Sequence, residues 1–123
     1  MTTRDNLPLV GIVGPCGSGK TTLVEGLKSL GIPTRHIAQE HSYVTNMWLR
    51  ITHPDFLIFL DASYAETVRR RCLNWTNEEY LEQHRRLSHA RDHANFYIFT
   101  DALKPDQVLD QVLTFLRDQG MNV

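Results

Sequence analysis

The sequence predicts an α/β domain, in which a mainly parallel sheet of about four strands lies between two layers of helices. Two observations support this fold class. Short, continuously apolar segments, which are typical of strands buried on both faces, alternate along the chain with segments whose apolar residues recur at helical spacing. The chain has 123 residues, which is enough for one hydrophobic core and too few for two. We therefore expect residues 1–123 to form a single domain.

Apolar runs predict three buried strands, over residues 9–13, 56–60 and 96–99. A further strand is predicted over residues 34–38, directly after Gly31 and Pro33 end the preceding helix. Helical segments separate these strands, as a parallel sheet requires, because its strands are joined by long crossover connections.

Apolar residues at helical spacing predict helices over residues 20–30, 42–52, 64–73, 77–92 and 105–116. Two of these helices begin with a capping box, in which two side chains three residues apart satisfy each other's backbone N–H groups. The boxes are Ser63 with Glu66 and Thr76 with Glu79. Pro105 suits the first turn of the last helix, because no intrahelical hydrogen bond is needed there.

The strongest functional signal is a glycine-rich segment between the first strand and the first helix. Residues 14–21 read Gly-Pro-Cys-Gly-Ser-Gly-Lys-Thr and match the phosphate-binding pattern G-x-x-x-x-G-K-[ST] at every fixed position. In this pattern, backbone N–H groups surround a polyphosphate that sits at the N-terminus of the following helix. We call residues 14–21 the glycine-rich loop.

The pattern assigns a role to several residues of this loop. Lys20 is expected to reach the β- and γ-phosphates of a nucleotide, Thr21 to bind Mg²⁺ through its hydroxyl, and Thr22 to contact the α-phosphate. The predicted nucleotide-binding residues are Gly14, Cys16, Gly17, Ser18, Gly19, Lys20, Thr21 and Thr22.

The composition is that of an ordinary globular protein, with 41% hydrophobic residues, 22% charged residues and a net charge of −1. These values argue against a disordered chain and against a wide nucleic-acid-binding or membrane-binding surface, so neither partner is expected. The apolar runs are far shorter than the roughly 20 residues of a membrane-spanning helix. No secretory signal is visible, so we expect Cys16 and Cys72 to be reduced thiols of a cytoplasmic protein.

Residues 54–71 read PDFLIFLDASYAETVRRR and resemble the core of the nucleoside- and nucleotide-kinase-like P-loop families, such as thymidylate kinase and adenylate kinase. Residues 96–101 and the helix that begins at Pro105 look like the C-terminal strand and helix of those families. With the glycine-rich loop, the resemblance covers about two-thirds of the chain. It implies a three-layer P-loop NTPase sandwich, ATP and Mg²⁺ as cofactors, and transfer of the γ-phosphoryl group to a small-molecule acceptor.

In the resembled kinases, arginines of a lid close over the phosphates and neutralise the charge on the transferred group. Residues 69–92 are expected to be such a lid-like segment, because six arginines gather there: Arg69, Arg70, Arg71, Arg85, Arg86 and Arg91. A basic cluster in a protein of nearly balanced charge favours an anionic partner. Arg69 and either Arg85 or Arg86 are the expected contacts.

The chain departs from the resembled kinases after the strand predicted over residues 34–38. Only about fifteen residues separate this strand from Pro54, where the kinases place an acceptor-binding insert and a further strand. We expect the strand over residues 34–38 to lie beside the first strand instead, so that Glu40 emerges next to the glycine-rich loop. Glu40 would then hold Mg²⁺ or act as the base toward an acceptor hydroxyl. Asp61 is the alternative carboxylate for the metal.

Two functions follow as hypotheses. The first is an ATP·Mg²⁺-binding P-loop NTPase that acts as a small-molecule kinase, with Lys20, Glu40, Arg69 and Arg85 as the catalytic residues. ATP is favoured because the chain lacks the Asn-Lys-x-Asp motif that reads guanine. The second is an ATP-binding or slowly hydrolysing module that regulates a protein partner, which would dock on the short helix that carries Met47 and Trp48.

Overall fold

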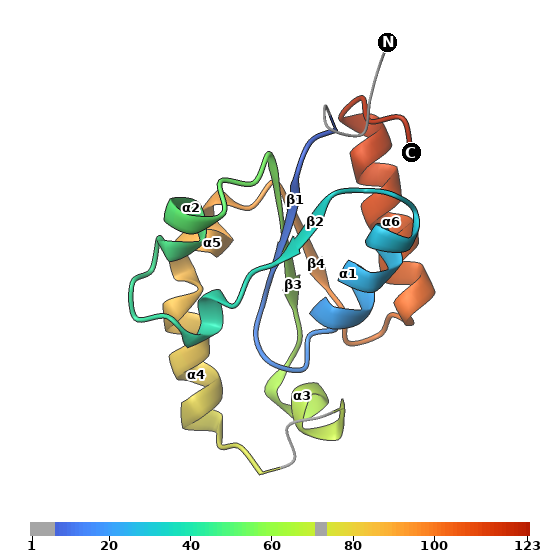
Figure 1. Ribbon diagram of the computed structural model, residues 1–123. Coiled ribbons are helices and arrows are strands. Elements are labelled where there is room, and N and C mark those ends of the chain that lie inside the picture. The colour runs from blue at the N-terminus through green and yellow to red at the C-terminus, as the bar shows by residue number, and fades with distance from the viewer. Residues whose placement is uncertain (1–6, 71–73) are drawn as a thin grey trace.

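The computed structural model describes residues 7–70 and 74–123, and its centre is a parallel sheet (Figure 1). Within the described residues the sheet has four strands in the order β2-β1-β3-β4. The strands are β1 (Val10–Val13), β2 (Thr34–His36), β3 (Phe56–Asp61) and β4 (Phe96–Phe99). All three pairings are parallel, and β1 pairs with both β2 and β3. The predicted α/β class, the parallel sheet and the position of the second strand beside the first are confirmed.

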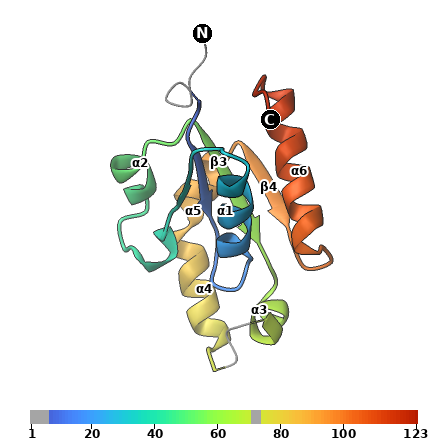
Figure 2. The same ribbon diagram turned by 45° about the vertical axis from the view of Figure 1, so that its right-hand side comes forward.

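Helices α1 (Lys20–Ser29) and α6 (Pro105–Asp118) cover one face of the sheet (Figure 2). Each helix presents an apolar stripe to this face, and the two stripes pack together over the inward side chains of the strands. The aromatic rings of Phe96 and Phe115 stack at the margin of this core, with their centroids 4.7 Å apart. This packing fixes the start of α1, and therefore the end of the glycine-rich loop, against the sheet.

Helices α4 (Asn77–Arg86) and α5 (Ser88–His93) lie on the other face, where Leu87 and Ala90 are fully buried against Leu57 and Phe59. The short helix α2 (Met47–Ile51) joins this layer through Trp48, whose indole N–H donates a hydrogen bond of 3.0 Å to Nδ1 of His89. Helices thus cover both faces of the sheet, an arrangement compatible with a three-layer sandwich.

Two predicted helices differ from those observed. The helix predicted over residues 42–52 is confined to α2 and is preceded by a 3-10 turn, η2 (Gln39–His41). The helix predicted over residues 77–92 is interrupted at Leu87. The carbonyl of Arg86 accepts a hydrogen bond of 3.2 Å from the side-chain amide of Gln39, so a long-range partner takes the place of a helical one at this point.

Helix α3 (Tyr64–Arg70) begins where the sequence predicts, after Ser63, whose hydroxyl accepts a hydrogen bond from the backbone N–H of Glu66. The capping box of Thr76 and Glu79 at the start of α4 is confirmed in both directions. Arg71 and Cys72 lie outside the described residues.

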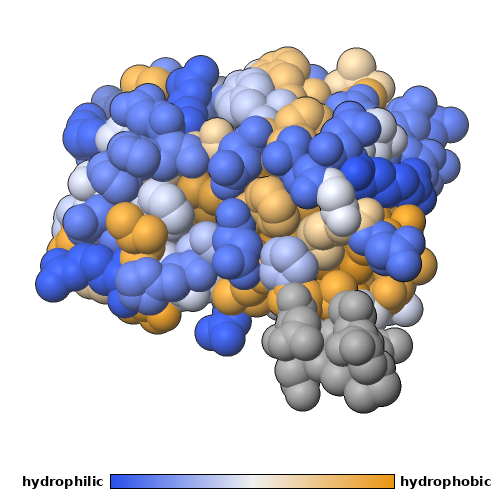
Figure 3. All heavy atoms as spheres, turned by 90° about the horizontal axis from the view of Figure 1, so that it is seen from above, coloured by the Kyte–Doolittle hydropathy of each residue, from blue (hydrophilic) through white to orange (hydrophobic). Residues whose placement is uncertain are grey.

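Among residues 7–70 and 74–123, no helix combines the length and apolar character needed to cross a membrane. The end of the molecule where the strands begin shows mostly polar side chains with apolar areas between them (Figure 3). The glycine-rich loop lies at the opposite end, where the strands finish (Figure 1).

Candidate functional site

The candidate site is a cavity of about 770 Å³ at the carboxyl ends of the strands. Its floor is the glycine-rich loop, which leaves β1 and enters α1. Its remaining walls come from β2 and η2 on one side, and from α3 and the connection between β4 and α6 on the other. Ligands of parallel α/β sheets bind at this edge, where the connections to helices on opposite faces diverge.

Two glycines give the loop its shape. Gly19, directly before α1, has a φ of 101°, a left-handed conformation that side chains other than glycine rarely adopt. Gly14 allows a close approach to the next strand, because a Cβ atom there would lie 2.1 Å from the carbonyl oxygen of Leu60. The loop is therefore held tightly between β1 and β3, and glycine is required at both positions.

Lys20 lies under the loop and is almost fully buried, with 5% of its side chain exposed. Its ammonium donates hydrogen bonds to the carbonyl oxygens of Gly14, at 2.6 Å, and Pro15, at 3.1 Å. The same nitrogen lies 2.9 Å from Oε2 of Glu40. The predicted proximity of Glu40 to the loop is confirmed, since the parallel pairing of β2 with β1 carries η2 to this edge of the sheet.

The carboxylate of Glu40 is buried, lines the cavity and has one unsatisfied oxygen. Oε2 pairs with Lys20 and lies 3.8 Å from Nε2 of His41, whereas Oε1 has no hydrogen-bond partner among the described residues. Leaving a buried carboxylate oxygen unpaired is costly, so Oε1 is suited to receive a hydroxyl proton, a water or a cation. His36 lines the same end of the cavity, and burial, together with the charge of Lys20, holds its pKa below the usual value.

The backbone that carries Glu40 is fixed by its neighbour, Gln39, whose side chain is 2% exposed. The amide nitrogen of Gln39 donates to the carbonyl oxygens of Val44 and Arg86, and its oxygen accepts a hydrogen bond of 2.8 Å from the backbone N–H of Trp48. Arg86 in turn donates to the carbonyl oxygen of Glu40 at 3.3 Å. One buried amide thus joins η2, α2 and α4 and holds Glu40 at the cavity.

Arg70 contacts the loop directly, a position that sequence reasoning did not single out. Its guanidinium donates to the carbonyl oxygen of Gly17 at 3.1 Å, and to the hydroxyl and carbonyl oxygens of Thr100 at 2.9 and 2.7 Å. The Thr100 hydroxyl also lies 3.1 Å from the carbonyl oxygen of Ser18. A sequence signal could have identified Thr100 as a site residue. It directly follows β4, and the carboxyl ends of parallel strands meet at the cavity.

Arg69 also lines the cavity, but its side chain is 71% exposed and pairs with Glu66. The hydrogen bond from Arg69, supported by one from Arg70, lowers the pKa of Glu66 to about 2. Arg69 thus keeps its expected place beside the loop, held only by a surface ion pair.

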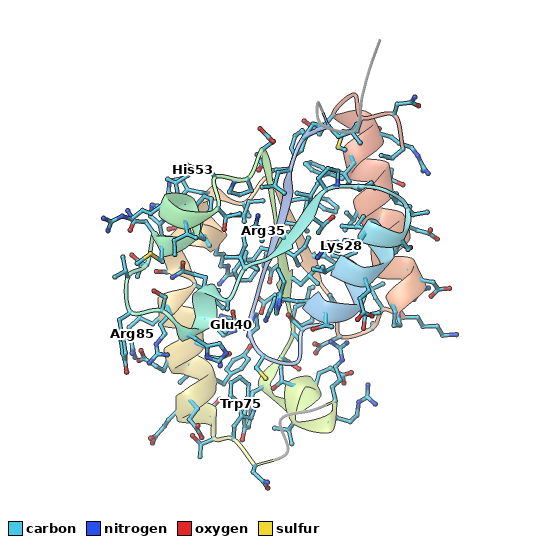
Figure 4. All side chains as sticks on the ribbon, viewed as in Figure 1. Lys28, Arg35, Glu40, His53, Trp75 and Arg85 are labelled. Carbon is cyan, nitrogen blue, oxygen red and sulfur yellow. The ribbon has the colours of Figure 1, made fainter. Side chains whose placement is uncertain are left out.

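Arg85 does not reach the cavity. Its guanidinium pairs with Glu82 on the outer side of α4, and Figure 4 shows it pointing away from the sheet. Arg86, the alternative lid contact, bonds Glu82 and the backbone of Glu40 and stacks over the ring of Tyr43. Of the arginine-rich segment 69–92, the described part that lines the cavity is Arg69 and Arg70, while α4 and α5 pack on the sheet.

Asp61 ends β3 as predicted, yet its carboxylate does not line the cavity. It accepts hydrogen bonds from the hydroxyl of Tyr97 and the backbone N–H of Ala62, and lies 3.4 Å from Nε2 of His84. Burial and the bond to Asp61 raise the pKa of Tyr97 to about 12, whereas burial lowers the pKa of His84. Because side chains alternate along a strand, Asp61 faces α4 like Leu57 and Phe59, and the structure brings Glu40 rather than Asp61 to the loop.

Among the described residues, no group of three or more His, Cys, Asp or Glu side chains is arranged to hold a metal ion. The acidic side chains that line the cavity come from separate elements, with Glu40 on η2, Glu66 on α3 and Asp101 after β4. Hydroxyl groups line it as well, among them that of Thr21 at the start of α1. A comparison with protein-family models and with curated proteins finds no match to this chain.

Proposed function

We propose that this protein binds ATP with Mg²⁺ at the glycine-rich loop and transfers the γ-phosphoryl group to a small-molecule acceptor, as a P-loop kinase. The observation that carries the proposal is the pairing of a complete phosphate-binding sequence pattern with a buried carboxylate, Glu40, 2.9 Å from the loop lysine. A bare glycine-rich turn has no need of a buried lysine and a buried glutamate at the same cavity.

The loop supplies the phosphate site. It sits at the N-terminus of α1, where backbone N–H groups and the helix dipole attract anions. Lys20 adds a positive charge, and its three donors now bond two carbonyl oxygens and Glu40, so it exchanges at least one of these partners when it binds a phosphate. The cavity volume lies within the range of small-molecule sites, and Leu103, Pro105 and Val108 give one end an apolar lining for a nucleoside.

The residues present fit Mg²⁺ bound together with phosphates. Mg²⁺ keeps several waters and typically takes one or two protein oxygens in addition to phosphate oxygens, so it does not need a cluster of carboxylates. Thr21 would provide a hydroxyl to the ion, and the unpaired Oε1 of Glu40 would either receive one of the ion's waters or serve as the base toward the acceptor hydroxyl, but not both at once. When bound, the ion would supply charge neutralisation on the phosphoryl oxygens.

The remaining chemistry falls to the side chains around the cavity. Lys20 and Arg69 would stabilise negative charge on the transferred group, while Arg70 holds the loop through Gly17. Glu40 would accept the proton of the acceptor hydroxyl through Oε1. Arg85 has no part in this proposal, because it lies at the outer surface of α4.

The test is transfer from radiolabelled ATP. The protein would be incubated with γ-labelled ATP, Mg²⁺ and a metabolite extract, and labelled products identified by mass spectrometry. We expect a product that depends on the extract and disappears in Lys20→Ala. Glu25→Gln, an exposed change on α1, serves as the control that keeps activity. Nucleotide binding without any acceptor-dependent product would contradict the kinase.

A second function, a nucleotide-binding module that regulates a protein partner, is supported by exposed apolar side chains around α2. Tyr43 is 82% exposed and Ile51 is 69% exposed. Trp48, on the helix suggested for docking, is itself buried and bonded to His89, so it would not contact the partner. Binding of ATP without transfer, combined with loss of partner capture in an Ile51→Ser variant, would favour this second function.

A further inference from the structure

Helix α4 contacts both halves of the site from outside the cavity. Oε1 of Gln83 accepts a hydrogen bond of 2.9 Å from the backbone N–H of Cys16, in the glycine-rich loop. One turn later on the same side of the helix, Arg86 donates to the carbonyl oxygen of Glu40. Gln83 does not line the cavity, whereas Cys16 does, so the first bond holds the loop from behind. Figure 1 shows α4 beside the loop.

The helix that carries Gln83 is itself anchored. The hydroxyl of Tyr80 donates a hydrogen bond of 2.7 Å to the carbonyl oxygen of Ala62, at the end of β3. Leu87, directly after the helix, is fully buried in the core on that face of the sheet. The Gln83 oxygen is therefore presented to the loop by an element that contacts the sheet on both sides of Gln83, through Tyr80 and Leu87.

The other side chains that bond the glycine-rich loop hold residues on either side of Cys16, not Cys16 itself. Arg70 bonds the carbonyl oxygen of Gly17 from α3, and Lys20 bonds the carbonyl oxygens of Gly14 and Pro15 from below. Gln83 accepts the hydrogen bond of the Cys16 N–H, between the positions that Lys20 and Arg70 hold. Since glycine-rich backbone is costly to order, a bond that fixes Cys16 before the ligand arrives lowers the entropic cost of binding.

We propose that Gln83 is a positioning residue for the phosphate site, and that α4 is a fixed support of the glycine-rich loop rather than a closing lid. This proposal rests on the proposed function, because it concerns how the same loop binds the phosphates of a nucleotide. Gln83 does not touch the nucleotide; it acts through the backbone of Cys16.

The test compares Gln83→Leu with the wild-type protein in two measurements. The first is the affinity for ADP with Mg²⁺, measured by calorimetry, and the second is hydrogen exchange of the Cys16 amide without nucleotide, followed by NMR. We expect Gln83→Leu to bind ADP about fivefold more weakly, the factor expected for one net hydrogen bond. The Cys16 amide should exchange faster, while amides of β1 keep their protection.

Two further variants separate positioning from a general effect on folding. Glu78→Gln alters an exposed side chain on the same helix and should leave both measurements unchanged. Gln83→Glu keeps an accepting oxygen and should retain the protection of the Cys16 amide, although its negative charge repels ADP. Rescue of protection by the conservative change is not expected if residue 83 only contributes to the stability of α4.

The outcomes are distinguishable. Wild-type affinity in Gln83→Leu, with or without faster exchange, would overturn the positioning role. Equal weakening in Gln83→Leu and Glu78→Gln would overturn it as well, because the effect would not depend on the bond to Cys16. If the wild-type protein does not bind ADP at all, the proposed function itself fails and this proposal fails with it.

Discussion

The ammonium of Lys20 and the carboxylate of Glu40 lie 2.9 Å apart, and both side chains are buried at the edge of the parallel sheet. Their elements are separate in sequence, one at the start of α1 and the other on the turn that follows β2. A buried pair of this kind stabilises a fold only weakly compared with apolar side chains, while the loss of one partner is costly. Its presence at a cavity therefore favours a functional explanation.

Replacing Lys20 with Met should destabilise the protein by about 3–5 kcal/mol, because it leaves the Glu40 carboxylate buried without a counter-charge. The double variant Lys20→Met with Glu40→Gln should recover most of this loss, since the uncompensated charge is gone. Urea denaturation would provide the free energies of unfolding. Equal stability of Lys20→Met and the double variant would show that Glu40 is not left as an uncompensated buried charge.

Glu40→Gln should reduce phosphoryl transfer by about 10²-fold or more, because an amide cannot accept the acceptor's proton. Binding of ADP should not weaken, since the Lys20 ammonium and the loop backbone still reach the phosphates, although loss of the Glu40 charge destabilises the fold without nucleotide. Turnover with an active extract and calorimetric binding would measure the two effects. A fully active Glu40→Gln enzyme would remove Glu40 from the mechanism.

In contrast to Glu40→Gln, Asp61→Asn should affect the stability of the protein rather than its activity. The carboxylate bonds Tyr97 and Ala62 away from the cavity, so its replacement should cost about 1–3 kcal/mol of stability and leave the affinity for ADP unchanged. Thermal or urea denaturation, combined with calorimetry, would separate the two. A large loss of Mg²⁺-dependent binding at unchanged stability would return Asp61 to the metal site.

Arg69→Ala should slow phosphoryl transfer by about 10²-fold and leave the unfolding free energy near the wild-type value, because the Arg69 side chain is 71% exposed and Glu66 keeps its ion pair with Arg70. Arg85→Ala is the matched comparison, since Arg85 also forms an exposed ion pair with a glutamate but lies away from the cavity. Rates measured at saturating ATP would distinguish them. Equal rates in the two variants would contradict a role for Arg69.

The stability of the protein should rise with pH across the acidic range, partly through Glu66. Hydrogen bonds from Arg69 and Arg70 lower its pKa from 4.5 to about 2. Between these values the unfolded chain binds the proton and the folded protein does not, so this stabilisation is present above pH 4.5 and disappears as the pH falls toward 2. Glu66→Gln should flatten this part of the profile, and added salt should weaken the effect. Identical acid profiles for the variant and the wild type would refute it.

Much of the fold could be predicted from sequence because the apolar runs are unambiguous. The strand predicted over 96–99 has the bounds of β4, and both predicted capping boxes mark real helix starts. Only the box of Thr76 and Glu79 is complete, because the backbone N–H of Ser63 donates to Asp101 instead of Glu66. The short helix predicted within residues 42–52 is present as α2, whereas residues 42–46 before it are not helical. The buried side chain of Gln39 bonds the carbonyl oxygen of Val44 in that segment and the backbone N–H of Trp48 in the first turn of α2. Such a long-range polar contact leaves no periodic pattern in the sequence.

The sequence predicts a site residue correctly where strand order alone brings that residue to the cavity. It does not predict which way a side chain points from its helix or strand. Glu40 reaches the loop because β2 must pair with β1 once no further strand intervenes. Arg85 was misplaced because neighbouring positions on a helix point in different directions, and Gln83 and Arg86 occupy the side that faces the site. The role of Asp61 could not be decided from sequence for the same reason. Its side chain lies on the sheet face that carries Leu57 and Phe59, and the sequence does not show that this face is the one away from the cavity.

The three-partner side chain of Gln39 has a consequence for sequence variation in this region. The surrounding residues 42–46 are mostly exposed, so their side chains contribute little to the core and substitutions there should accumulate readily. Position 39 is different, because no hydrophobic residue of similar volume can serve two carbonyl groups and one N–H at once. A library randomised at position 39 and at residues 42–46, with Glu40 kept, and selected for folding should therefore converge on glutamine at position 39 and vary freely over residues 42–46.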